Sequence, residues 1–170
     1  MKRQVLVLIC ALSLSGCAAS EQANSEYSAA DIAFAEQMIP HHEQAIEMSE
    51  IALINTTNPE VLQLAQEIKV AQSPEIQLMK SWEGVKESTH SGHLMDGMLS
   101  EVELSDFREA KGKEFDLLFL RGMIKHHEGA IAMAQEVAAS MNKDVADLSA
   151  LIIAAQQLEI TKMNELLLKS

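Results

Sequence analysis

Hydrophobic residues recur every three or four positions along most of the chain, the spacing that gathers them on one face of an α-helix. Turn and capping residues divide this pattern into segments 28–54, 59–85, 100–112, 113–141 and 145–168, and each segment is expected to be helical. No segment shows the sustained alternation of a β-strand, and aromatic residues make up only 4% of the chain. The pattern therefore predicts an all-α protein.

The ends of these helices carry capping and breaking signals. Residues 28–31 and 100–103 each place a serine three positions before an acidic residue, as in a capping box. Pro59 suits a first helical position. Pro74 is expected to kink or loosen the second helix, and Gly112 is expected to end the short third one.

One motif occurs twice. MIPHHEQAIEM at residues 38–48 returns as MIKHHEGAIAM at residues 123–133, and AQ-x-x-EI-x-x-M recurs in the second and last helices. Each half is therefore a helical hairpin. Two hairpins packed antiparallel form a four-helix bundle, with residues 86–112 as a long connection that carries the short extra helix.

A helical wheel of about 100° per residue places polar residues on the buried stripes. His42 falls on the stripe of the first helix, His41 at its edge, and Glu43 on the opposite face. A buried carboxylate needs a partner, so Glu75 is expected to meet a histidine of the neighbouring helix. The predicted bundle centre contains histidines, methionines and other polar residues from both halves: His41, His42, His126, His127, Met38, Met48, Met123, Met133, Asp31, Gln72, Glu75, Asp116, Gln156 and Glu159.

Two interpretations of this centre are open. In the first it is a metal-free hydrogen-bond network that fixes the register of the helices. In the second it is a metal site, because bundle proteins build metal centres from side chains on facing helices. Methionine beside histidine would favour copper, especially Cu(I), since thioether is a soft ligand. Buried methionines also serve simply as core packing.

A second group of candidate ligands lies in the loop of residues 86–99. His90, His93, Met95 and Met98 occur in HSGHLMDGM, and the glycines are expected to leave the loop flexible enough to wrap an ion. The alternative is a linker whose composition has no such role.

The N-terminus predicts export. Residues 1–17 join a basic start, a short apolar run and Leu-Ser-Gly-Cys, which resembles the lipobox of bacterial lipoproteins, with Cys17 as the lipidated residue. Residues 18–27 would form a tether and residues 28–170 the duplicated domain. A plain secreted protein cut elsewhere is the alternative. The folded part then contains no cysteine, so a metal could be held only by His, Met and carboxylates.

Charge and motifs exclude some functions. The formal net charge of −12 argues against a nucleic-acid partner. No catalytic nucleophile motif and no glycine-rich phosphate loop stands out.

The repeated motif, the stretch FDLLFLRGMIKHHEGAIAMA, the segment GMLSEVEL and the AQ-x-x-EI-x-x-M helix ends resemble the bacterial family called domain of unknown function 305. The likeness covers about residues 28–163. It implies a ferritin-like four-helix fold and export or lipid anchoring. For some members it implies copper handling in the periplasm by Met and His ligands, with His41, His42, His126, His127 and the neighbouring methionines as the residues to test. The small number of loop methionines argues against high-capacity copper storage.

The sequence thus predicts an envelope-anchored protein that binds a metal ion, copper above all, for tolerance or delivery. Two other classes stay open. One is a metal-free module that docks another envelope protein or a second copy of itself. The other is a metal-dependent redox enzyme of the ferritin-like type.

Overall fold

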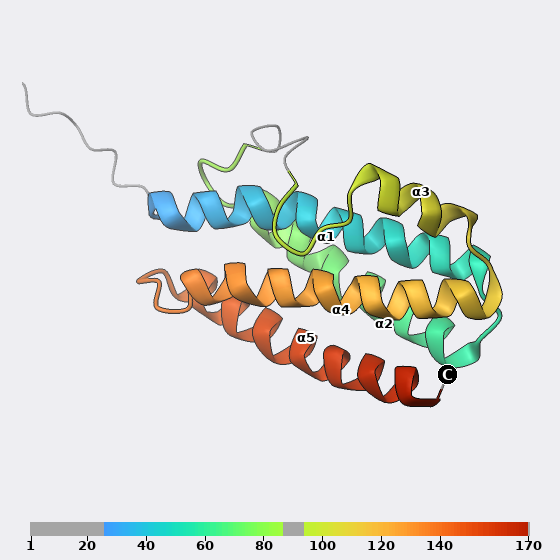
Figure 1. The fold of residues 1–170 in the computed structure, drawn as a ribbon. Coiled ribbons are helices and arrows are strands. Elements are labelled where there is room, and N and C mark those ends of the chain that lie inside the picture. Colours follow the sequence, from blue (N-terminus) through green and yellow to red (C-terminus); the bar gives the residue numbers. More distant parts are fainter. Residues whose placement is uncertain (1–25, 87–93, 170) are drawn as a thin grey trace, which may run out of the picture.

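The computed structural model describes residues 26–86 and 94–169, and within them it contains helices and no strand (Figure 1). The helices are α1 (Ala29–Asn55), α2 (Pro59–Lys80), α3 (Glu101–Glu109), α4 (Gly112–Glu136) and α5 (Lys143–Lys169). The predicted all-α class is confirmed.

Local sequence explains where α1 and α2 begin and continue. Ser28 caps α1, because its Oγ accepts a hydrogen bond from the Asp31 amide at 3.1 Å and its own amide donates to the Asp31 carboxylate at 2.8 Å. Pro59 occupies the first turn of α2. α2 is one continuous helix through Pro74, as α1 is through Pro40, so the kink or loosening expected at Pro74 does not interrupt the helix.

Several predicted boundaries are wrong. The second helix ends at Lys80, and residues 81–84, which include Trp82, form turns instead of a further helical turn. Gly112 starts α4 instead of ending the short helix, which stops at Glu109. At its other end α4 stops at Glu136, earlier than predicted, and α5 begins directly after Asn142. The Asn142 side-chain oxygen accepts hydrogen bonds from the first backbone amides of α5, which no proline or glycine signal announces.

Two helical hairpins form the bundle. α1 pairs with α2 and α4 pairs with α5, while α1 and α4 form the main contact between hairpins and α2 and α5 touch little. α1 and α4 run antiparallel along the length of the molecule, and α3 lies beside one end of α1 (Figure 1). No described helix is long and apolar enough to cross a membrane.

The apolar core falls into two clusters, one toward each end of the bundle. One contains Met38, Met79 and Trp82, and the other contains Met48 and Met123 together with the aromatic side chains of α3 and α4. The four motif histidines belong to neither cluster, although all four are fully buried. The fold therefore places a polar layer between two apolar ones.

Candidate metal centre

Two histidine–carboxylate hydrogen bonds repeat the same geometry in the two hairpins. His42 Nε2 lies 2.8 Å from Glu75 Oε2, and His127 Nε2 lies 2.6 Å from Glu159 Oε2. Each pair joins the motif helix of a hairpin to its partner helix. The pairs differ in exposure, since the Glu159 side chain is 18% exposed and the Glu75 side chain 10%. Glu159 is thus less buried than the helical wheel predicts.

The other two motif histidines meet across the interface between α1 and α4. The rings of His41 and His126 have centroids 3.8 Å apart. His41 Nε2 donates a hydrogen bond to the Asp96 carbonyl at 3.1 Å. Neither ring nitrogen of His126 has a hydrogen-bond partner among the described residues. His41, predicted at the edge of the stripe, is as fully buried as His42.

These contacts fix which ring nitrogens can accept a metal ion. A carbonyl or an ionised carboxylate only accepts hydrogen bonds, so His41, His42 and His127 each present an Nε2–H to oxygen. In the neutral ring the Nδ1 atom then has a free lone pair, and each of these Nδ1 atoms is buried without a partner in the described structure. A histidine that binds a metal through one ring nitrogen usually donates a hydrogen bond from the other ring nitrogen to a carboxylate or a backbone carbonyl.

Burial keeps the facing rings neutral. The pKa of His41 is lowered to about 3, chiefly by burial and next by repulsion from His42, while the hydrogen bond to the Asp96 carbonyl opposes the shift. Burial also holds the pKa of His126 well below its usual range, with repulsion from His41 and His127 as the next causes; the His41 backbone opposes the shift, although its geometry falls short of a hydrogen bond. Neutral imidazole is the form that binds a metal ion.

Buried methionines lie on both sides of the histidine layer. Met38 and Met123 precede the histidines of their own helices by one turn, and both are fully buried, as is Met48. Met133 is only partly buried at the edge of its cluster. Met38 lies in one apolar cluster and Met123 in the other, so thioethers are present on each face of the layer.

The donor set fits a soft ion better than a hard one. No group of three or more His, Cys, Asp or Glu side chains is arranged to hold a metal ion in residues 26–86 and 94–169. A hard divalent ion needs more oxygen ligands than the layer supplies. Paired neutral imidazoles with unpartnered nitrogens and nearby thioethers suit Cu(I).

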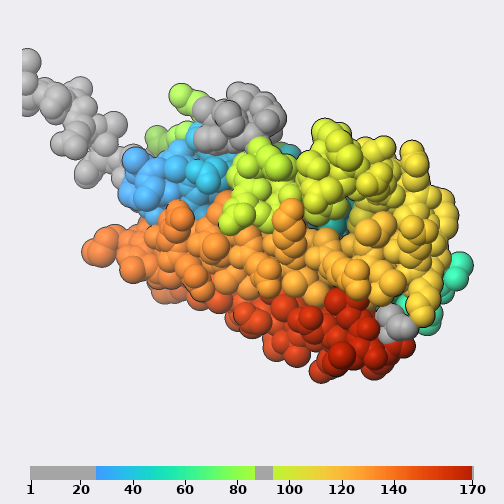
Figure 2. Space-filling view, viewed as in Figure 1, coloured from blue at the N-terminus to red at the C-terminus, as the bar shows by residue number. Residues whose placement is uncertain are grey.

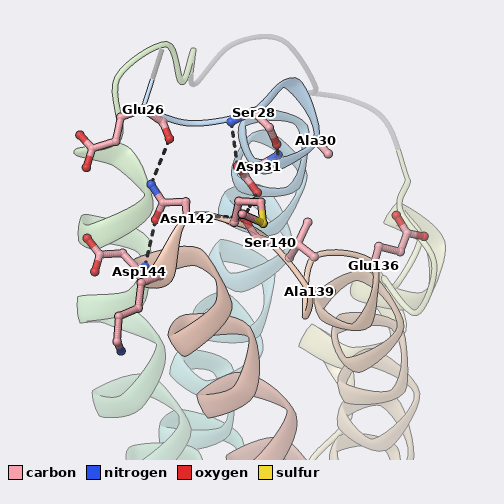
Figure 3. Close-up of a pocket in the computed structure, with 12 residues that line it drawn as sticks. Glu26, Ser28, Ala30, Asp31, Glu136, Ala139, Ser140, Asn142 and Asp144 are labelled. Carbon is pink, nitrogen blue, oxygen red and sulfur yellow. Dashed lines mark hydrogen bonds between the residues drawn. The ribbon is translucent and has the colours of Figure 1, made fainter. Parts of the chain in front are cut away.

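The two aspartates predicted in the centre lie elsewhere, at opposite ends of the bundle. Asp31 caps α1 and accepts a hydrogen bond from Ser140 Oγ at 2.7 Å, in a pocket where the α4–α5 turn meets the start of α1 (Figure 3). Asp116 accepts a hydrogen bond from the Asn58 side chain at 3.1 Å at the α1–α2 turn. The helical wheel gave the correct buried face but not the position along the bundle, because Asp31 is the third residue of α1 and Asp116 the fifth residue of α4.

The remaining candidates divide into described and undescribed residues. The Gln72 and Gln156 side-chain amides are buried, and their nitrogen and oxygen atoms have no partner among the residues described. Met95 and Met98 are partly buried on the connection. His90, His93 and Cys17 lie outside the described residues.

Sequence reasoning missed the residues that bring the connection onto this centre. Gln44 pairs with the backbone of Leu99 through two hydrogen bonds of 2.7 and 2.9 Å. Gly129 lies against the backbone of Asp96. The sequence does contain a sign of this contact, because positions 44 and 129 are equivalent in the repeat but carry glutamine in one copy and glycine in the other.

Replacing Glu75 with alanine is expected to lower the free energy of unfolding by about 1–3 kcal/mol, because the buried His42 loses its partner. Glu159→Ala should cost less, because its side chain is more exposed. Glu43→Ala is the control: Glu43 is 51% exposed in a surface pair with Lys80, so its loss should change stability by at most about 0.5 kcal/mol. Urea unfolding measures all three, and equal losses at Glu75 and Glu43 would contradict the buried pair.

The family is decided by a sequence match that spans most of the chain. The family model described as domain of unknown function, DUF305, matches residues 31–167. The chain is a member of the DUF305 family. A search of curated proteins found no match.

Solved DUF305 structures share the fold. A DUF305 protein from Streptomyces coelicolor superposes with a TM-score of 0.76 at 29% identity, covering 82% of this chain and 93% of that one. A DUF305 fragment from Deinococcus radiodurans gives a TM-score of 0.73 at 26% identity, covering 84% and 98%. The expected four-helix fold of the family is therefore confirmed.

A third relative, CopM, was solved with copper. CopM in its Cu(II)-bound form is 34% identical, with a TM-score of 0.69 over 79% of this chain and 93% of that one. CopM was also solved in a Cu(I)-bound form, at 31% identity and a TM-score of 0.64 over the same shares. The proteins that resemble this chain in sequence and fold thus include one solved with copper bound.

Proposed function

We propose that this DUF305 protein binds copper as Cu(I) in the histidine layer between α1 and α4. The observation that carries the proposal is the set of buried, neutral histidines whose free nitrogens have no partner in the described structure. Burying such groups unpaired is costly. A bound ion would recover that cost.

The choice of Cu(I) rests on the ligand types and on the relatives. Imidazole nitrogen with thioether sulfur selects copper over calcium or magnesium. The Cu(I)- and Cu(II)-bound CopM structures, with 31% and 34% identity to this chain, support the same metal. In this proposal the ion is cargo: the protein chelates it and buffers it or passes it on.

The location in the envelope is part of the same proposal. The lipobox-like segment that ends at Cys17 would anchor the chain by lipid, and residues 18–27 would tether the domain to the membrane surface. His90, His93, Met95 and Met98 on the connection are proposed as an outer set of ligands.

Anaerobic competition for Cu(I) against a coloured chelator tests this function. The probe is Cu(I) alone, added to a soluble form that starts after Cys17. We expect the protein to remove Cu(I) from the chelator with a defined stoichiometry. Replacing all four motif histidines in a still-folded variant should abolish that competition. No competition by the unaltered protein would leave the metal-free interaction module as the better account.

A further inference from the structure

The connection between the hairpins breaks the symmetry of the histidine layer. The Met98 amide donates a hydrogen bond to the Met95 carbonyl at 3.2 Å, and Gly97 has a φ of 84°. A positive φ at the third position is that of a type II turn. This turn, residues 95–98 and hereafter the 95–98 turn, directs its Asp96 carbonyl at His41. The yellow-green connection crosses α1 toward α4 in Figure 1, and its atoms lie on both helices in Figure 2.

On α4 the turn packs backbone against backbone. A Cβ atom added at Gly129 would lie 2.1 Å from the Asp96 carbonyl oxygen, and one added at Gly97 would lie 2.6 Å from the Lys125 carbonyl oxygen. Neither neighbour is a flexible side chain that could move aside. Gly97 therefore permits close docking, which corrects the expectation that it makes the loop flexible.

On α1 the connection is held by side chains. The Gln44 amide both donates to and accepts from the backbone of Leu99, and these bonds are buried. His41 donates to Asp96 one turn earlier on the same helix. The two contacts clamp the connection at both ends of the Asp96–Leu99 segment.

The clamp treats the two copies of the repeat differently. Gln44 and Gly129 occupy the same position of the motif, as do His41 and His126. The first copy supplies an amide that binds the connection, and the second copy supplies the space for it. In this arrangement His41 has a backbone partner, whereas neither ring nitrogen of His126 has one within the described residues.

We propose that Gln44, Gly97 and Gly129 are positioning residues that dock the 95–98 turn and so give His41 and His126 unequal roles. The docked Asp96 carbonyl holds His41 as the Nε2–H tautomer, which leaves the lone pair of its buried Nδ1 atom free. His126 remains the ring that is free to exchange between ligand and unliganded states. The inference deepens the proposed copper function and rests on it for the role of His126.

Two glycine variants on α4 provide a matched test. Gly129→Ala puts a methyl group into the Asp96 carbonyl, whereas Gly122→Ala meets only side-chain carbons of Met48 and Leu99, at 3.4 Å or more. Both changes add the same methyl group to the same helix. Long-range ¹H–¹⁵N spectra of the metal-free protein report the tautomer of each imidazole, and the Cu(I) competition assay reports affinity.

The expected result is specific to His41. In Gly129→Ala the ¹⁵N chemical shifts of the His41 ring should move from those of the Nε2–H tautomer toward the average of both tautomers. The shifts of His42 and His127 should not change. Its Cu(I) affinity should fall by about 10- to 100-fold, as when an outer partner of a metal-binding histidine is lost. Gly122→Ala should match the unaltered protein in both measurements.

Gln44→Leu tests the same docking contact in case Gly129→Ala does not fold. Gln44→Leu removes both hydrogen bonds to Leu99 without entering the turn, and it should change the His41 pattern in the same direction. An unchanged His41 tautomer in either folded variant would overturn the inference, as would equal effects of Gly129→Ala and Gly122→Ala. If the tautomer responds but the unaltered protein takes up no Cu(I), the docking role stands and the copper function fails.

Discussion

Replacing His126 with leucine is expected to weaken Cu(I) binding without destabilising the metal-free protein. His126 is fully buried, and neither of its ring nitrogens has a partner among the described residues. Its removal therefore abolishes an unpaired polar group, and the free energy of unfolding should stay constant or rise by about 1–3 kcal/mol. Cu(I) affinity should fall by more than the about 10- to 100-fold that is lost when a metal-binding histidine loses its hydrogen-bond partner.

His127→Leu is the control on the same helix. His127 is equally buried, but it pairs with Glu159, so its replacement strands a carboxylate and should lower stability. Urea unfolding of both metal-free variants, with Cu(I) competition on each, separates a ligand from a structural group. A destabilised His126→Leu protein with normal Cu(I) affinity would show that the ring is core structure.

Acidification from about pH 7 to about pH 5 is expected to destabilise the metal-free protein steeply. Burial lowers the pKa of His41 to about 3 and that of His126 well below its usual range. The unfolded chain takes up these protons below about pH 6.5 while the folded chain does not, so stability is complete above that pH and falls as the pH drops. Each such histidine contributes about 1.4 kcal/mol per pH unit.

Three carboxyl groups with lowered pKa values titrate below the chosen pH range and do not contribute to the expected decline. The pKa values of Asp31, Glu67 and Glu103 are lowered from values that already lie below the range. Urea midpoints should decline as the pH is lowered across the range. The decline should be smaller in His126→Leu, because this variant lacks the contribution of one buried histidine. A flat profile in the unaltered protein would mean that the buried rings take up protons in the folded protein as readily as in the unfolded chain.

Much of the fold follows from the sequence because it rests on short-range rules. The three-to-four-residue spacing sets the helices, the serine caps set the starts of α1 and α3, and the duplicated motif sets the hairpin symmetry. The rule that a buried carboxylate needs a partner was enough to place Glu75 against a histidine of the neighbouring helix.

The parts that could not be predicted depend on contacts distant in sequence. A helical wheel gives a direction from the helix axis and no position along the bundle, so Asp31 and Asp116 were assigned to the centre although they lie at its ends. The docking of the 95–98 turn depends on the space left at Gly129, which only the assembled helices define. The difference between Gln44 and Gly129 at equivalent positions of the repeat is visible in the sequence, but the sequence does not show that the 95–98 turn docks there.

The most direct test of the copper centre is Cu K-edge X-ray absorption on the Cu(I)-loaded protein. The account predicts nitrogen neighbours with the outer-shell scattering of imidazole, together with sulfur from thioether. In His126→Leu the imidazole signal should weaken. A spectrum of oxygen neighbours without imidazole scattering, or one unchanged in His126→Leu, would contradict copper binding in the histidine layer.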